Sequence, residues 1–114
     1  MIAVIFEVWL APEQMTEYLN LAADLRDELV LQDGFISIER FSSISEAGKM
    51  LSLSFWRDES AVKAWRCSAM HRDAQLLGRK SVFKNYRLRV AKVARDYGMA
   101  ERGQAPADSL SLHG

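Results

Sequence analysis

The residues best suited to chemistry lie close together in the sequence: Trp56, Trp65, His71 and Gln75. Large aromatic faces can hold a flat ring against an apolar wall. An unperturbed histidine titrates near neutrality, so His71 could accept a proton from a bound molecule or donate a hydrogen bond to one of its oxygens. This stretch predicts a pocket with two aromatic walls and one candidate proton acceptor.

Each tryptophan also has a structural interpretation. Trp65 falls on an apolar helix stripe, where a tryptophan is more often part of the core. Trp56 would serve a subunit interface equally well. However, Trp56 shares a strand face with Ser52 and Ser54, and small hydroxyls beside a large ring leave space. We therefore expect Trp56, Ser52, Ser54 and Tyr86 of the last strand to bind substrate.

Glu7 is a second candidate for acid-base chemistry. It is the one charged residue in the apolar run 2–9, which is typical of a strand buried on both faces. Burial would raise the pKa of Glu7 unless a basic group pairs with it. The alternative is a structural ion pair with an arginine of the last strand.

Other function classes lack their usual motifs. Cys67 and His71 offer only two potential metal ligands, and no P-loop, GxGxxG or nucleophile elbow is present, so we expect no metal and no cofactor. The 15 basic and 15 acidic residues leave no net charge, which argues against nucleic acid and anionic membranes as partners. A single cysteine and the lack of a basic leader predict a cytoplasmic protein, and no apolar run is long enough to span a bilayer.

Hydrophobic periodicity predicts the elements that position these residues. A helix over residues 12–32 has an apolar stripe of Met15, Leu19, Ala22, Leu25 and Leu29. Asp58 is expected to cap a later helix. The expected strands are residues 2–9, 35–43, 49–57 and 83–97, and the expected helices are residues 12–32, a segment after Asp58, and about 68–78.

The order strand, helix, strand, strand, helix, strand is the ferredoxin-like βαββαβ arrangement, an α+β fold in which strands one and three are central. It predicts a four-stranded antiparallel sheet within one domain of residues 1–98. Residues 99–114 are rich in Gly, Ala, Pro, Ser and Asp and are expected to form a tail without a core role. If this tail is ordered, we expect it to lean on a neighbouring subunit.

Over residues 1–97 the chain resembles the antibiotic biosynthesis monooxygenase (ABM) domain proteins of the dimeric α+β barrel superfamily. The residues that carry the resemblance are SFWRDE at 54–59, AW at 64–65, HRDAQ at 71–75, YRLRVA at 86–91 and RDY at 95–97. The resemblance implies a homodimer whose two sheets face each other, with a pocket in each subunit between sheet and helices.

Two kinds of chemistry occur in that superfamily. The haem-degrading members use a first-strand asparagine, a helix tryptophan and a haem-ligating histidine. Trp65 matches the tryptophan, but Glu7 stands at the asparagine position and Gln75 at the histidine position. Because glutamine is a poor axial ligand for haem iron, haem binding or degradation is the less favoured alternative, with His71 as the substitute ligand it would need.

The cofactor-independent members oxygenate aromatic polyketide or quinol-type substrates with molecular oxygen. The resemblance therefore favours a homodimeric monooxygenase that needs no cofactor and acts on a small aromatic or quinone-like molecule. In this hypothesis Trp65 is the ring platform, His71 accepts the proton, and Gln75 or Glu7 orients the substrate. The alternative from another class is a dimer that binds a small molecule without converting it.

Overall fold

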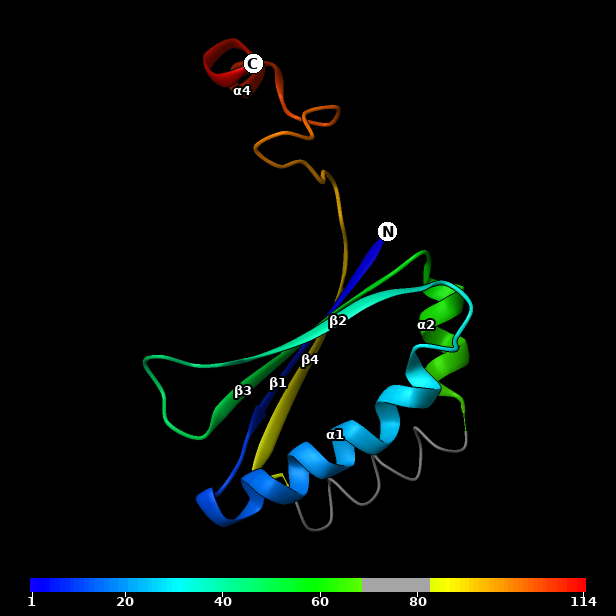
Figure 1. Ribbon diagram of the computed structural model, residues 1–114, viewed down its shortest axis with the longest axis vertical. Coiled ribbons are helices and arrows are strands. Elements are labelled where there is room, and N and C mark those ends of the chain that lie inside the picture. Colours follow the sequence, from blue (N-terminus) through cyan, green and yellow to red (C-terminus); the bar gives the residue numbers. More distant parts are fainter. Residues whose placement is uncertain (69–82) are drawn as a thin grey trace.

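The computed structural model describes residues 1–68 and 83–114 as a four-stranded sheet with helices on one face and a projecting C-terminal segment (Figure 1). The strands are β1 (Ile2–Trp9), β2 (Phe35–Ser42), β3 (Lys49–Trp56) and β4 (Asn85–Lys92). The helices are the 3₁₀ turn η1 (Pro12–Gln14), α1 (Met15–Leu29), α2 (Glu59–Arg66) and α4 (Ala107–His113). The helix predicted near residues 68–78 lies almost entirely outside the described residues.

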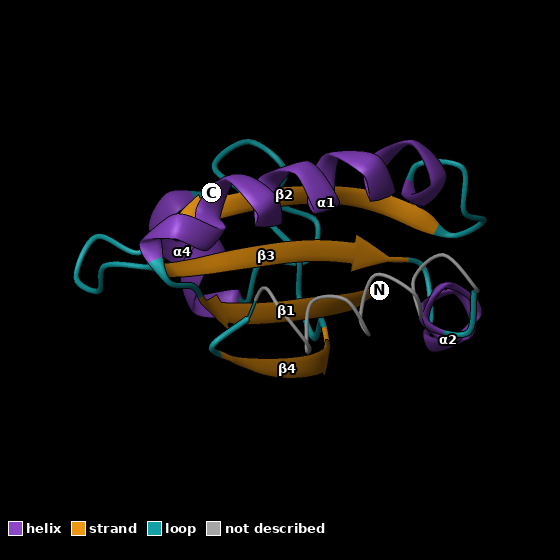
Figure 2. Cartoon of the chain, turned by 90° about the horizontal axis from the view of Figure 1, so that it is seen from below, coloured by secondary structure: helices purple, strands orange, loops and turns teal. Residues whose placement is uncertain are grey.

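The sheet confirms the predicted ferredoxin-like α+β fold. Its strand order is β2-β3-β1-β4, and every neighbouring pair is antiparallel (Figure 2). Strands β1 and β3 are therefore central, as the almost wholly apolar sequence of β1 predicts. Figure 1 shows α1 and α2 on the same side of the sheet, and we call the face on that side the inner face.

Two elements end three or more residues earlier than predicted. Helix α1 stops at Leu29. The amides of Leu31 and Gln32 bond three residues back in a tighter turn, and Gly34 then adopts a positive φ of 84°. Strand β4 stops at Lys92 rather than at residue 97. Its partner at that end is Ile2, the first residue of β1. The last contact is the Val93 amide, which donates to the Met1 carbonyl oxygen over 3.0 Å.

Helix α1 also turns a slightly different stripe towards the sheet. Tyr18, Ala22 and Leu29 are buried, whereas Leu19, which was predicted inside, is 45% exposed. Consecutive side chains of an α-helix point about 100° apart, so Tyr18 and Leu19 cannot both face the sheet. The inward position belongs to the tyrosine, which brings a hydroxyl to the inner face.

The buried core forms two clusters at opposite ends of β1. One cluster contains Ile2, Leu29, Trp56, Ala61, Val62 and Trp65. The other contains Val8, Leu10, Tyr18 and Met50. Between these ends, Val4 and Phe6 of β1 are only partly buried, and both line a cavity under the helices.

The C-terminal segment projects beyond the end of the sheet and finishes in α4 (Figure 1). Arg102 holds this segment together, since its guanidinium donates to the Gly98 carbonyl oxygen over 3.0 Å and to the Gly114 carbonyl oxygen over 2.7 Å. It also bonds the Ser109 hydroxyl. In the described part of the chain, none of the helices combines the length and the apolar composition needed to cross a membrane.

Candidate functional site

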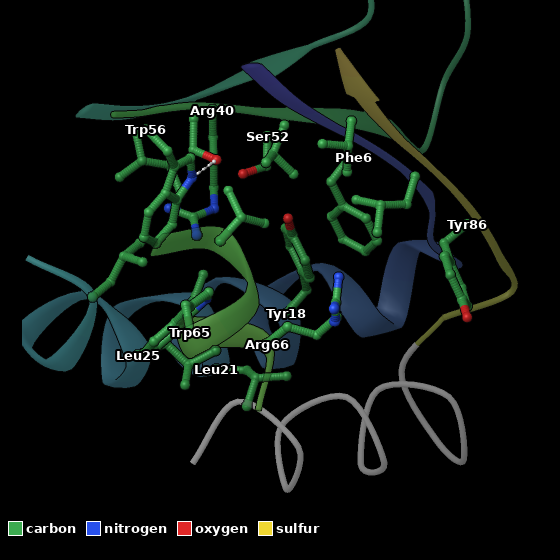
Figure 3. A pocket seen from close by; sticks show the side chains of 18 of the residues that line it. Phe6, Tyr18, Leu21, Leu25, Arg40, Ser52, Trp56, Trp65, Arg66 and Tyr86 are labelled. Carbon is green, nitrogen blue, oxygen red and sulfur yellow. Dashed lines mark hydrogen bonds between the residues drawn. The ribbon is translucent and has the colours of Figure 1, made fainter. Parts of the chain in front are cut away.

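A cavity of about 410 Å³ lies between the inner face of the sheet and helices α1 and α2 (Figure 3). This volume is in the usual range for a small-molecule site. All four strands and both helices contribute side chains to its wall. The predicted residues Trp56, Trp65, Ser52, Ser54 and Tyr86 all line it.

Trp56 is the most firmly held of these residues. Its side chain is 2% exposed, and its indole N–H donates to the Ser54 hydroxyl over 3.0 Å. The Phe35 ring meets the indole edge-on, with ring centroids 5.3 Å apart. A buried indole needs an acceptor for its N–H, and Ser54 supplies it from the same strand face. Ser54 therefore orients Trp56 as well as lining the pocket.

Trp65 enters the pocket from α2, which begins where the sequence predicts. The Ala61 amide donates to the Asp58 carboxylate over 2.9 Å, which confirms Asp58 as the N-cap. Arg57 hydrogen-bonds this carboxylate, and with the Ala61 amide it holds the pKa of Asp58 below its ordinary value. Arg57 also pairs with Asp33 in the turn after α1. This junction fixes the start of α2 and hence the position of Trp65.

The remaining predicted binding residues form opposite parts of the wall. Ser52 is 8% exposed, and the described residues contain no hydrogen bond to its hydroxyl. Tyr86 belongs to the more open β4 side and is 38% exposed. Its ring lies 5.8 Å from that of Phe6 and 6.1 Å from that of Phe83. The pocket thus has a closed end at Trp56 and an aromatic, more accessible end at Tyr86.

Sequence reasoning missed three polar residues of the pocket: Tyr18, Arg40 and Arg66. Figure 3 shows Arg40 reaching into the cavity from the sheet and Tyr18 pointing towards the sheet from α1. Tyr18 was hidden because Leu19 fits the apolar periodicity of α1 equally well. Arg66 looked like an ordinary basic residue in the last turn of α2.

Arg40 faces the pocket because β2 contains a bulge. Phe35 lies opposite Trp56 on the inner face, and Ser37 already lies opposite Phe55 on the outer face, so Ile36 is an extra residue. Bulges of this kind re-aim the side chains that follow them. Beyond the bulge, every second residue faces inward, and this places Arg40 directly opposite Ser52 on the inner face.

Glu7 does not belong to this pocket. It lies on the outer face of β1, where the Arg89 guanidinium donates to its carboxylate over 3.1 Å and the Lys49 ammonium lies 3.6 Å away. Burial raises the pKa of Glu7, but the hydrogen bond from Arg89 and the charge of Lys49 outweigh it and lower the pKa below its ordinary value. The alternative of an ion pair with a last-strand arginine is therefore what the structure contains.

His71 and Gln75, the other two predicted catalytic residues, lie outside the described residues. Across residues 1–68 and 83–114, no group of three or more His, Cys, Asp or Glu side chains is arranged to hold a metal ion. The polar residues that line the described pocket are Tyr18, Ser52, Ser54 and Tyr86, with hydroxyl groups, and Arg40 and Arg66, with guanidinium groups. These groups can bind and orient a ligand.

The sequence model of the antibiotic biosynthesis monooxygenase family matches residues 1–76 of the chain. The protein named jasmonate monooxygenase ABM, from Pyricularia oryzae, is 50% identical over 93 residues, which cover 82% of this chain and 43% of that protein. Protein YqjZ of Bacillus subtilis is 34% identical over 84 residues, covering 73% of this chain and 65% of its own length. The chain thus spans less than two thirds of either curated relative.

Among solved structures, Rv0793 from Mycobacterium tuberculosis superimposes with a TM-score of 0.76, covering 85% of this chain and 98% of its own. The two sequences are 15% identical, so this likeness concerns the fold. It supports the same arrangement of sheet and helices around the cavity.

Proposed function

The chain belongs to the antibiotic biosynthesis monooxygenase family, and we propose that it is a cofactor-independent monooxygenase that acts on a small aromatic or quinone-like molecule bound in this pocket. The observation that carries the proposal is the cavity itself, a largely apolar space with Trp56 and Trp65 in its wall and few polar groups. Such a site binds a flat ring by burying its faces and orients it through the few polar contacts. Trp65 is the proposed platform for the ring.

The proposed reaction needs only the substrate and molecular oxygen. An anthrone or hydroquinone that has lost a proton is electron-rich enough to reduce O₂ itself. One oxygen atom then forms a bond to the ring carbon, the other leaves as water, and the substrate supplies the electrons. With an anthrone, a CH₂ group plus O₂ becomes C=O plus H₂O; with a hydroquinone, the products are a hydroxyquinone and H₂O. The protein would bind the ring, accept the proton at His71 and exclude bulk water. Ser52 and Tyr86 would contact the substrate, and Gln75 would orient it.

Oxygen consumption tests the proposal. We expect uptake with an anthrone or a naphthohydroquinone, both of which can supply the electrons themselves. The His71→Ala variant should lose uptake, whereas His113→Ala, at the other histidine of the chain, should retain it. Absence of uptake with both compounds, combined with measurable binding, would favour the alternative of a binding protein without turnover. A Soret shift with haemin that His71→Ala removes would favour the haem alternative.

We further propose that the outer face of the sheet pairs with a second copy of the chain. Its centre is apolar, with Ile5 on β1, Leu53 and Phe55 on β3 and Phe41 on β2. Acidic and basic groups lie beside this centre, including Glu7 and its partners Arg89 on β4 and Lys49 on β3. A face that carries both signs of charge can complement itself about a two-fold axis. The projecting segment 99–114 would then contact the partner subunit.

The mass in solution tests this pairing. We expect light scattering to give twice the chain mass of 12.9 kDa for the unchanged protein. Leu53→Asp, which buries a charge in the proposed interface, should give the monomer mass, while Leu31→Asp, at a leucine that is 77% exposed, should leave the dimer intact. A monomer mass for the unchanged protein at micromolar concentration would contradict the pairing.

A further inference from the structure

Arg40 is an unusual residue to find on the inner face of this sheet. Its neighbours across and along the strands are Ser52 and the apolar wall of the pocket, and no ion pair to Arg40 exists among residues 1–68 and 83–114. Its Nε atom is covered by protein atoms and has no hydrogen-bond partner in this part of the chain, while the residue as a whole is partly buried. Leaving a buried charged donor unpaired is costly, so such a group in a native fold requires an explanation.

The surroundings of Arg40 favour an anion. Two of the described residues that line the pocket are basic, Arg40 and Arg66, and none of them is Asp or Glu. The hydroxyl groups of Ser52 and Tyr18 also lie in the wall, and no hydrogen bond to either occurs in the described structure. Within residues 1–68 and 83–114, the wall therefore offers the guanidinium of Arg40 and the hydroxyls of Ser52 and Tyr18 as donors and contains no carboxylate. The apolar walls lower the local dielectric, which strengthens the attraction of Arg40 for a negative group.

The form of the guanidinium narrows the choice of anion. Its planar N–H groups match the two oxygens of a carboxylate, which they bind with two parallel hydrogen bonds. We propose that this pocket, taken as the substrate site of the proposed function, selects a flat apolar molecule that carries a carboxylate. The carboxylate pairs with Arg40 beside Ser52, and the ring system extends between Trp56 and Trp65 towards Tyr86. Arg40 is then a specificity-determining residue, and the bulge at Ile36 is the device that turns it inward.

Binding of 2-naphthoate and of its methyl ester, measured by isothermal titration calorimetry, tests the inference without any turnover. The two probes share the same ring, but only the acid carries a negative charge. Charge-assisted hydrogen bonds predict that the acid binds about 10-fold more tightly than the ester. Arg40→Gln should abolish this preference, and Arg40→Lys should retain part of it because it keeps the charge but loses the planar fork. Arg26→Gln, at an exposed arginine of α1, is the matched control and should change neither affinity.

Equal binding of acid and ester by the unchanged protein, or tighter binding of the ester, would overturn the inference even if the variants failed to fold. A preference for the acid that survives in folded Arg40→Gln would overturn the role of Arg40. The proposed oxygenation can fail independently, because a protein that prefers the acid and consumes no oxygen would retain this specificity as a binding protein. Oxygen uptake without any preference for the acid would support the proposed oxygenation and overturn the proposed carboxylate specificity.

Discussion

Ser52 and Ser54 provide a matched pair for testing how the pocket is built. They lie on the same face of β3 and are 8% and 6% exposed, so that a change to alanine removes the same atom from nearly the same environment. They differ in one interaction, since only the Ser54 hydroxyl accepts the hydrogen bond from Trp56. We predict that Ser54→Ala destabilises the fold and that Ser52→Ala does not.

The expected magnitude follows from the group that is left behind. In Ser54→Ala the buried indole N–H of Trp56 loses its acceptor, and an unsatisfied buried donor costs about 1–3 kcal/mol. In Ser52→Ala no partner is left unsatisfied, so the free energy of unfolding should change by less than about 0.5 kcal/mol. A difference of about 1–2 kcal/mol corresponds to roughly 4–8 °C in the unfolding temperature of a small domain.

Urea unfolding followed by far-UV circular dichroism measures the difference, with all proteins at one concentration because association would add to the apparent stability. A double-mutant cycle with Trp56→Phe isolates the hydrogen bond, because Ser54→Ala should have little effect once the indole N–H is gone. Equal unfolding midpoints for Ser52→Ala and Ser54→Ala would refute the reasoning. So would an unchanged effect of Ser54→Ala in the Trp56→Phe background.

Three further predictions concern the supports of the site. Gly34→Ala should lower the free energy of unfolding by about 2 kcal/mol, because Gly34 has a positive φ and an added Cβ would lie 2.7 Å from the Cβ of Ala61. The control is Gly98→Ala, where an added Cβ would meet no atom within 4 Å, and it should leave the free energy of unfolding nearly unchanged in the same denaturation experiment. Because the pKa of Asp58 is lowered, its carboxylate stabilises the fold at pH values above the ordinary pKa of 3.8, and this stabilisation is lost as the pH falls through the lowered pKa. In an acid titration, Asp58→Asn should therefore lose less stability than the unchanged protein over that pH range. Identical titration curves for the two proteins would contradict the assignment. Arg102→Gln should accelerate amide hydrogen exchange in the C-terminal segment without changing exchange in the sheet, and unchanged exchange there would show that the guanidinium does not hold the segment.

The fold was predictable because its strongest signals are local. The apolar run of β1 indicates a central strand, and the alternation in β3 separates Leu53 from Ser54 and Trp56 without any knowledge of the partners. Asp58 marks the start of α2, because its side chain caps the helix N-terminus. Each of these signals depends on backbone periodicity or on a capping preference within a few residues. Their agreement explains why both tryptophans were correctly expected near one space.

The positive charge of the pocket was not predictable, because it depends on the pairing register of β2 with β3, which no local sequence pattern indicates. Without the bulge at Ile36, strict alternation from Phe35 would turn Arg40 to the outer face, where an arginine attracts no notice. The choice between the two faces is made by pairing with β3, a neighbour that the sequence of β2 does not specify. Glu7 shows the same dependence on neighbouring strands. Its apolar surroundings in the sequence predicted an acid with a raised pKa, whereas basic side chains from two other strands pair with its carboxylate.

These two placements have a common consequence for function. The sheet separates its charges by face. The ion-paired carboxylate of Glu7 lies on the outer face, and the guanidinium of Arg40, which has no ion pair within residues 1–68 and 83–114, lies on the inner face. A balanced set of charges suits a surface that pairs with a copy of itself, whereas an unbalanced positive charge suits a cavity that admits an anion. Reversing the charge at Arg40 should therefore alter ligand choice while the oligomeric state persists. Reversing it at Glu7 should alter oligomeric state while ligand choice persists, and a variant that changed both together would show that the two faces are not independent.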